Sequence, residues 1–252
     1  MNDPVVGGAP QGTPAIVGSA ELIRLLNHAD DNLVLAQRLG EWISNAPDLE
    51  LDIALGNIAL DHLGVARSLY ELAGEIEGRG RSEDDFAMLR TERQFTNLLL
   101  VEQPNGDFAN TIVRQVFFDL YQRHLWADLA TSDHSQLAGI VARAAKENAY
   151  HREFSGNWLI RLGDGTEEST RRVQEAVDRL WMFTSEMFDG SAAAYRQPWQ
   201  TELNQLFSEA GLVIPEDPYQ KSGGRVGFHT EHLGFILAEM QWMQRSYPGM
   251  EW

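Results

Sequence analysis

The sequence predicts an all-α protein, built as a bundle of long antiparallel helices with extra helices at its C-terminal end. Apolar residues recur at three- and four-residue steps through most of the 252 positions, which is the period of an amphipathic helix. No segment shows the two-residue alternation of a strand above this helical period. Short turn-forming segments separate the long helical stretches, so consecutive helices are expected to be antiparallel neighbours.

Composition indicates one domain preceded by a tail. Residues 1–18 contain three prolines and four glycines and almost nothing to bury, so we expect a disordered tail there. The remaining residues, 19–252, contain no linker that would divide them, and 43% of the chain is hydrophobic. We therefore expect a single helical domain with one substantial core.

Charge and cysteine content exclude several classes of protein. The formal net charge is −17, so nucleic acid and anionic membrane surfaces are poor partners. The chain has no cysteine, which excludes disulfides, thiolate metal sites and cysteine-ligated iron–sulfur clusters. Neither a signal-peptide pattern nor an apolar run of membrane-spanning length is present, and we expect a soluble cytoplasmic protein.

The first half of the chain predicts three long helices and one short one. Ser19 suits the cap of the first, which ends before Pro47 because the residue preceding a proline resists the helical conformation. Asp48 begins the second, a Pro-Asn-Gly turn ends the short one, and Asp107 or Asn110 begins the third long helix. The expected helices span residues 19–45, 48–78, 86–102 and 107–129.

The second half predicts the fourth long helix and three further ones. The fourth begins at about Ser135 and ends at a Gly-Asp-Gly turn. The helix after it begins at Glu167, and a less regular region with one short helix precedes the last helix, which ends before Tyr247. The expected helices span residues 135–162, 167–188, 199–210 and 230–246.

Two pairs of long helices suggest a ferritin-like bundle. In that fold each helix pair supplies one acid alone and one Glu-x-x-His motif to a di-iron centre. Residues equidistant from the turn of an antiparallel pair lie side by side, and counting from the two turns brings four acids to one level. These acids are Asp31, Asp61, Asp119 and Glu147.

The imidazoles that a di-iron centre requires are out of position. Gly64 and Tyr150 occupy the positions three residues after the second and fourth acids. His151 shares a face with Glu147 but comes one residue late, so it is a distorted ligand at best. His62 is rotated by about 100° from the neighbouring acid and is expected to face elsewhere.

We therefore expect no metal in this chain, and interpret Asp31, Asp61, Asp119, Glu147 and His151 as a degenerate di-iron site. Buried acids without a metal need cations, because an unpaired buried charge is costly. The candidates are Arg38, Arg67, Arg114 and Lys146.

Two other segments suggest binding sites less strongly. His229 and His232 have a spacing that suits zinc, but no third ligand is visible, and a helix start with Glu231 favoured by the helix dipole explains them better. The glycine-rich segment 223–227 follows no strand and lacks the lysine of a phosphate-binding loop.

Several ordered motifs resemble the C subunits of bacterial phenylacetyl-CoA epoxidases, also called phenylacetate-CoA oxygenases. The resemblance extends from about residue 27 to residue 252. The motifs are DNLVL (31–35), QRLGEW (37–42), ERQFTNLLLVEQPNG (92–106), KE (146–147), YH (150–151), HTEHLG (229–234) and AEMQ (238–241).

The resemblance implies a ferritin-like subunit that has lost its di-iron centre and pairs with a homologous catalytic A subunit, which keeps it. Together with a reductase and a small B-type subunit, these proteins use dioxygen and electrons from NADPH to epoxidise the ring of phenylacetyl-CoA. We expect a scaffold subunit, with self-association of the chain alone. The alternative is a di-iron oxygenase or oxidase in its own right.

Overall fold

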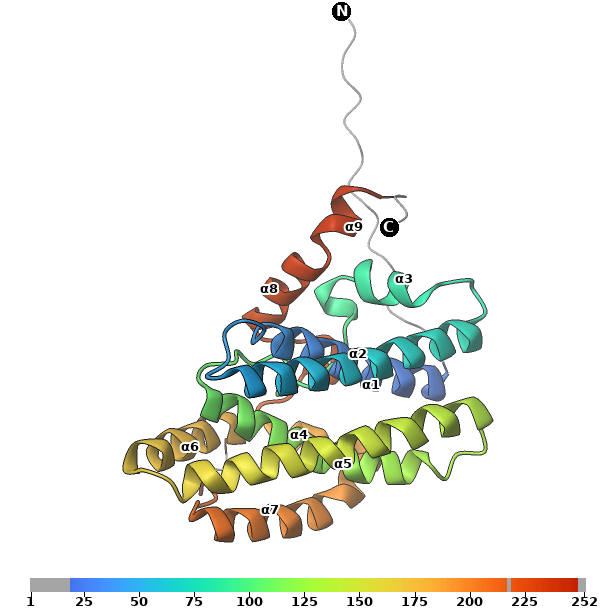
Figure 1. Cartoon of the computed structure of the whole chain (residues 1–252). Helices are drawn as coiled ribbons and strands as arrows, with labels where there is room; N and C mark the ends of the chain where they lie inside the picture. The colour runs from blue at the N-terminus through green and yellow to red at the C-terminus, as the bar shows by residue number, and fades with distance from the viewer. Residues whose placement is uncertain (1–18, 217–218, 249–252) are drawn as a thin grey trace, which may run out of the picture.

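Two helical hairpins, stacked as two layers, form the centre of the protein (Figure 1). The computed structural model describes residues 19–216 and 219–248, and the expected tail over residues 1–18 lies outside them. The first hairpin pairs α1 (Ala20–Gly40) with α2 (Leu49–Glu77), and the second pairs α4 (Phe108–Leu129) with α5 (Ser135–Gly163). No strand occurs in the described residues, so the all-α bundle is confirmed.

Side-chain caps begin the long helices where the sequence predicts them. Ser19 Oγ accepts from the backbone N–H of Leu22 at 3.2 Å, and Asp48 and Asp107 cap α2 and α4 in the same way. Each cap satisfies a backbone donor that the first helical turn leaves without a partner, which stabilises a helix by about 1 kcal/mol.

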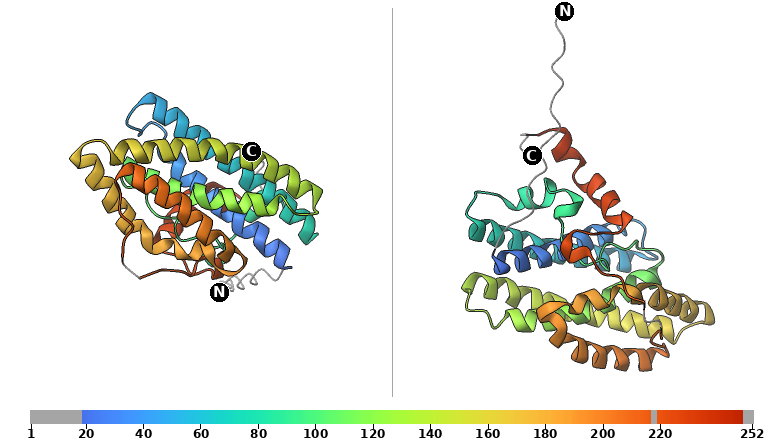
Figure 2. Two further views of the ribbon diagram at one scale, coloured as in Figure 1. Left: turned by 90° about the horizontal axis from the view of Figure 1, so that it is seen from below. Right: turned by 180° about the vertical axis from the view of Figure 1, so that it is seen from behind.

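Shorter helices cover the two hairpins (Figure 2). On the side of the second hairpin, α6 (Glu167–Leu180) packs on α4, and α7 (Arg196–Ala210) packs on α5. On the side of the first hairpin, α3 (Glu83–Met88) packs on α2, and α8 (Glu231–Met240) packs on α1. The last helix, α9 (Trp242–Ser246), continues from α8 and projects beyond the bundle.

The prediction of a helix over residues 86–102 is wrong. After α3 only a single 3-10 turn, Glu92–Gln94, is helical, and the segment that follows it is not. Backbone N–H groups of this segment donate to buried carboxylates of distant residues: Thr96 to Asp30 at 2.8 Å and Leu98 to Asp31 at 2.7 Å. A helix would use these donors internally, so the long-range bonds favour an open backbone.

Other helices are shorter than predicted or interrupted, and α1, expected to reach residue 45, ends at Gly40. The helix expected to reach residue 188 ends as α6 at Leu180, and 3-10 turns carry the chain on to Tyr195. The helix expected over 230–246 is broken between α8 and α9 at Gln241, whose side chain donates to the carbonyls of Ala87 and Arg90. In the latter two places buried contacts with other segments accompany the loss of regular helix.

One hydrophobic core runs through both hairpins and the helices that cover them. It includes residues from Leu22 in α1 to Leu237 in α8, and its fully buried aromatic side chains include Trp126, Phe117 and Phe118. Within the described part of the chain, no helix combines the length and the apolar composition needed to cross a membrane.

Candidate functional site

A polar cluster lies at the centre of this apolar bundle, where α1, α2, α4 and α5 meet. Every member is at most 3% exposed. We call this set the central cluster: Asn32, His62, Asp119, Gln122, Asn148, His151 and Ser155. Burying polar groups costs free energy unless they find hydrogen-bond partners, so their contacts show what each side chain does here.

Asn32 determines the tautomer of His62. The Asn32 side-chain Nδ2 donates to the carbonyl of His28 at 2.7 Å, which leaves Oδ1 directed toward the cluster. That oxygen accepts from Gln122 Nε2 at 3.0 Å and lies 2.8 Å from His62 Nδ1. Because an amide oxygen only accepts, His62 Nδ1 carries the proton and Nε2 bears the lone pair. Nε2 is buried and has no hydrogen-bond partner in the described structure.

A hydrogen bond to Asp61, at the edge of the central cluster, orients the ring of His151. Its Nε2 lies 3.0 Å from Oδ2 of Asp61, a partly exposed carboxylate on α2. The carboxylate accepts, so Nε2 donates, and in the neutral imidazole Nδ1 bears the lone pair. Nδ1 is buried and also has no partner among the described side chains. The His151 and His62 rings have centroids 5.0 Å apart.

Asp119 is the single carboxylate of the central cluster. Its Oδ2 accepts from Ser155 Oγ at 2.8 Å, and its Oδ1 lies 3.3 Å from Gln115 Nε2. Burial raises the pKa of Asp119 to about 6, against the opposing effects of His151 and the Ser155 hydrogen bond. One ligand atom each from Asp119, His62 and His151 lie within 4.8 Å of one another.

The other acids expected in this interior lie elsewhere. Asp31 faces away from the cluster and pairs with Arg225, whose Nη2 lies 2.7 Å from Oδ2. Burial acts to raise the pKa of Asp31, but the charge and hydrogen bonds of Arg225 and His28 together outweigh burial, so the pKa is lowered. Asp61 lies at the edge of the cluster, and Glu147 accepts from Arg143 Nε at 2.7 Å on the partly exposed side of α5.

Of the five residues predicted for the degenerate site, the structure therefore places only Asp119 and His151 in the central cluster. The expected cations are not the ones that neutralise the acids either. Arg225 and Arg143 take that role for Asp31 and Glu147. The predicted cations were Arg38, Arg67, Arg114 and Lys146. None of them forms a described ion pair with any of the four acids.

The predicted interior positions have the correct level along the helix axes, but the wrong face of α1, α2 and α5 was expected to point inward. Asn32 contacts His62 across the first hairpin, and Asn148 Nδ2 donates to the carbonyl of Asp119 across the second at 3.1 Å. The paired levels are thus within one residue of the expected ones. On α1, α2 and α5, however, the inward position is one residue later, which is a rotation of about 100°. These positions are Asn32, His62 and Asn148.

The observed rotation reveals two altered Glu-x-x-His motifs. Buried Ala59 precedes His62 by three residues, and Asn148 precedes His151 by three residues. Both imidazoles of the motif are present, while both glutamates are replaced by residues with no carboxylate. The spacing of the two histidines from Ala59 and Asn148 is visible in the sequence. It was overlooked because the motif was sought three residues after Asp61 and Glu147.

The central cluster does not fit a di-iron centre of the ferritin-like class. Such a centre needs a carboxylate from each of four helices to bridge and neutralise two ions. Here α1 presents Asn32, α2 presents Ala59 and α5 presents Asn148, so only Asp119 on α4 supplies a carboxylate.

A second buried polar network was missed by the sequence analysis. Glu102 is fully buried, and its oxygens accept from the backbone N–H of Thr230 at 2.6 Å and bond to His229 Nδ1 at 2.9 Å. The other His229 nitrogen bonds to the carbonyl of Phe95 at 2.9 Å. Both nitrogens of His229 are therefore hydrogen-bonded, and these bonds join the start of α8 to the loop before α4. His229 is one of the two histidines considered above for zinc.

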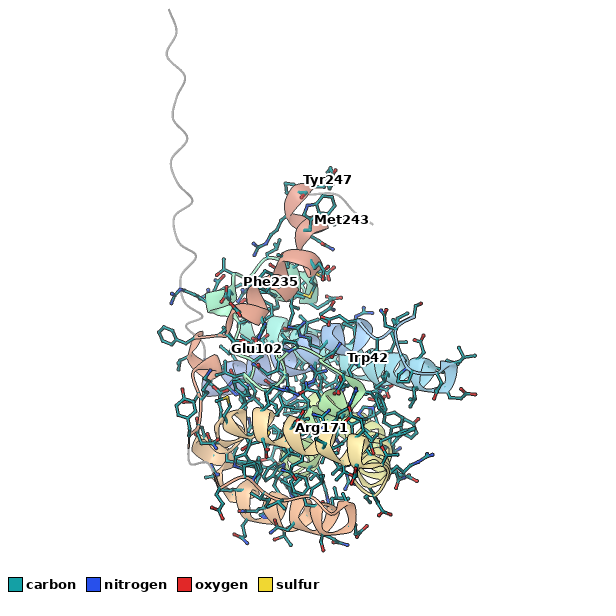
Figure 3. The ribbon with its side chains drawn as sticks, turned by 90° about the vertical axis from the view of Figure 1, so that its left-hand side faces the viewer. Trp42, Glu102, Arg171, Phe235, Met243 and Tyr247 are labelled. Atoms are coloured by element: carbon teal, nitrogen blue, oxygen red, sulfur yellow. The ribbon has the colours of Figure 1, made fainter. Side chains whose placement is uncertain are left out.

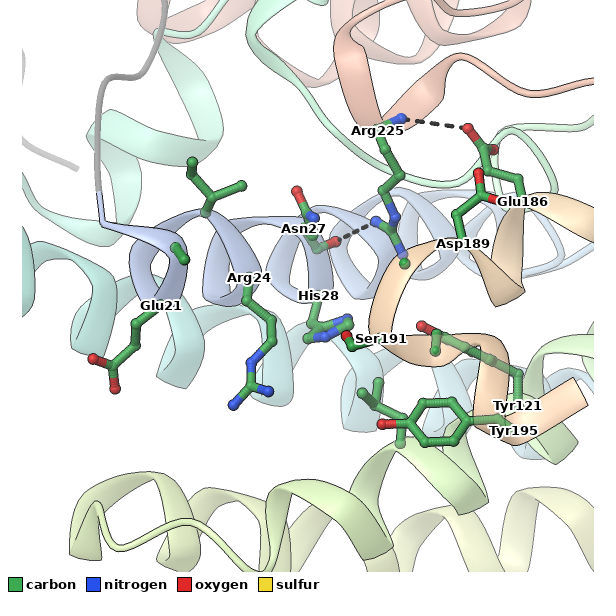
Figure 4. A pocket seen from close by; sticks show the side chains of 15 residues that line it. Glu21, Arg24, Asn27, His28, Tyr121, Glu186, Asp189, Ser191, Tyr195 and Arg225 are labelled. Atoms are coloured by element: carbon green, nitrogen blue, oxygen red, sulfur yellow. Dashed lines mark hydrogen bonds between the residues drawn. The ribbon is translucent and has the colours of Figure 1, made fainter.

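A surface pocket of about 620 Å³ is lined by residues that do not belong to the central cluster (Figure 4). One wall is α1, with Arg24 and His28, and the opposite wall carries Tyr121 and Tyr195. Arg225 closes one end and donates to the carbonyl of Asn27 at 3.1 Å. The central cluster is thus separate from the described surface cavities.

Comparison with known proteins identifies the family of this chain. The chain is 47% identical over 241 residues to the C subunit of the 1,2-phenylacetyl-CoA epoxidase of Escherichia coli K12, covering 90% of this chain and 97% of that protein. It is 23% identical over 243 residues to the A subunit of the same E. coli epoxidase, covering 88% of this chain and 75% of that protein. The family model described as phenylacetic acid catabolic protein matches residues 13–252, and the chain belongs to this ferritin-like family.

Proposed function

We propose that this chain is the non-catalytic, supporting subunit of a 1,2-phenylacetyl-CoA epoxidase and that it binds a di-iron catalytic A subunit. The observation that carries the proposal is the composition of the central cluster, in which Asp119 is the single carboxylate where a di-iron centre needs four. The similarity to the C and A subunits of the E. coli epoxidase supports the assignment to that complex in phenylacetate degradation.

An apolar stripe on the outer face of α2 supports a lasting protein interface. Its side chains are between 41% and 69% exposed and recur at steps of four, seven and three residues, so they share one helix face. We call this the α2 stripe: Leu49, Ile53, Leu60 and Leu63. Isolated soluble chains rarely leave a row of large apolar side chains on one helix face in water, which favours a partner chain over it.

The C-terminal arm, formed by α8 and α9, offers a second apolar surface (Figure 3). It extends away from the two hairpins and carries four large side chains that are 43% to 70% exposed. These are Phe235, Trp242, Met243 and Tyr247. Aromatic and methionine side chains are enriched at the centres of protein interfaces, so the arm is suited to bind the catalytic subunit.

The redox chemistry belongs to other subunits in this proposal. The di-iron centre lies in the A subunit, a reductase supplies electrons from NADPH, and the remaining component of the complex is a small B-type subunit. The composition of this chain supports that division, because it contains no cysteine to hold an iron–sulfur cluster.

Co-purification of tagged chain with the A subunit of the same organism tests the proposal. Leu60→Lys places a charge in the α2 stripe and is expected to lower recovery of the A subunit by at least about tenfold. Val213→Lys is the matched control, because Val213 is 67% exposed and Leu60 is 64% exposed, and its recovery is expected to equal that of wild type. Failure of the wild-type chain to retain the A subunit would contradict the proposal.

A further inference from the structure

We propose that the central cluster binds one divalent metal ion of the zinc class through His62 Nε2, His151 Nδ1 and the Asp119 carboxylate. The three residues lie on α2, α5 and α4, one ligand atom from each lies within 4.8 Å of the other two, and all three side chains are buried. Two imidazoles and one carboxylate are a common protein ligand set for such ions. This inference goes beyond the proposed function and does not depend on it.

Both imidazoles are already arranged as metal ligands. The Nδ1–H of His62 donates to Asn32 Oδ1, and the Nε2–H of His151 donates to Asp61. Metal-binding histidines typically donate their second nitrogen to a carbonyl or carboxylate, which fixes the ring and leaves the other lone pair on the metal. Those two remaining nitrogens are the buried atoms for which the described structure shows no partner.

The charges of the site also suit a cation. Asp119 is buried, and no lysine or arginine of the described chain forms an ion pair with it. A divalent ion would offset the cost of burying this carboxylate.

The enclosure of the site assigns the ion a structural role. Each member of the central cluster is at most 3% exposed, and none of them lines the five best-formed surface pockets of the described residues. Ligand atoms around a tetrahedral ion with bonds of about 2.1 Å lie about 3.4 Å apart, so ligand atoms within 4.8 Å of one another need to approach by at most about 1.4 Å. The ion would then join α2 of the first hairpin to α4 and α5 of the second.

Metal reconstitution of the full chain tests this inference. The protein is stripped with a chelator in mild denaturant, refolded, and titrated with Co²⁺ as a spectroscopic probe and with Zn²⁺ as its competitor. We expect one ion per chain, Co²⁺ absorption bands that Zn²⁺ removes, and a higher melting temperature for the loaded protein.

Matched variants locate the ion. His62→Leu and Asp119→Asn are expected to abolish the Co²⁺ bands, with folding checked by circular dichroism. Asp61→Asn keeps all three ligands and weakens the outer hydrogen bond to His151, so affinity is expected to fall about 10- to 100-fold. His232→Gln, which removes an imidazole on α8 outside the cluster, is expected to bind as wild type does.

Three results would overturn the inference. The first is a folded wild-type chain that binds no ion, because a shared proton or a trapped water molecule then satisfies the three groups. The second is binding that Asp61→Asn, His62→Leu and Asp119→Asn all leave unchanged, because the ion then lies elsewhere. The third is two ions per chain. None of these readouts involves the A subunit, so failure here is distinct from failure of the proposed function.

Discussion

Arg225 is paired with Asp31 across 194 positions of the chain, with Nη2 2.7 Å from Oδ2 and Nη1 2.9 Å from Oδ1. The same guanidinium donates to the carbonyls of Asn27 and Thr96. Arg225 therefore connects the segment before α8 to α1 and to the loop that follows the 3-10 turn. The acid expected to face a metal site instead holds the C-terminal part of the fold in place.

Arg225→Met is expected to destabilise the protein by about 3–5 kcal/mol, because it leaves Asp31 buried without its cation. Asp31→Asn combined with Arg225→Met should recover part of that loss, since the uncompensated charge is then absent. Urea unfolding followed by circular dichroism measures both variants. Equal stability of Arg225→Met and wild type would show that the pair does not support the fold.

The His229–Glu102 contact predicts a pH-dependent stability. Burial opposes a charge on His229, but the hydrogen bond to Glu102 and its negative charge outweigh burial and raise the pKa of His229. The stabilisation is therefore fully present below pH 6.5, the ordinary pKa, and is lost as the pH rises through the raised pKa.

His229→Gln is expected to remove this pH dependence and to cost about 1.5–3 kcal/mol at pH 6, the range for a hydrogen bond to a charged group. His232→Gln is the control, because His232 has no described bond to Glu102 and should keep the wild-type profile. Unfolding curves between pH 5 and pH 8 measure the effect. An unchanged profile in His229→Gln would assign the dependence to another group.

The long helices could be predicted because their signals are local. Ser19, Asp48 and Asp107 each cap a helix through a bond to a backbone N–H three residues later, and Gly78 ends α2 with a φ of 68°. The segment 95–103 could not be predicted, because its backbone donors bond to carboxylates far away in the chain, such as Glu186 for Leu99. Apolar spacing alone does not reveal such bonds.

The sequence predicted the position of the candidate site along the four long helices, but not most of the residues that form it. Counting from the two turns locates opposite residues to within one position, yet one position rotates a side chain by about 100°. Asp61 and Glu147 were therefore predicted to point inward, whereas His62 and Asn148 do so in the structure. The Asp31–Arg225 pair left no local signal, because its partners meet only in the folded chain.

The isolated chain is expected to leave phenylacetyl-CoA unchanged when electrons and dioxygen are supplied. Activation of dioxygen needs a redox metal or cofactor, and the central cluster is enclosed and has one carboxylate, Asp119. Product formation is measured with the metal content of the same sample determined in parallel. Turnover by the lone chain that a chelator abolishes would support the di-iron oxygenase alternative instead.

The isolated chain is also expected to self-associate through its apolar surfaces. Trp242→Glu places a charge on the C-terminal arm and should shift the sedimentation profile toward monomer. Val213→Glu, on an exposed apolar residue outside the arm, should leave the profile as in wild type. Equal profiles for Trp242→Glu and wild type would exclude the arm as the contact.

Sedimentation of the wild-type chain titrated with the catalytic A subunit tests the central claim most directly. If the α2 stripe and the C-terminal arm are the binding surfaces of a supporting protein, the two chains should form a stable complex of fixed stoichiometry at micromolar concentration. The self-associated species should disappear as that complex forms. A clean monomer that, at these concentrations, does not bind the A subunit would contradict the proposed function.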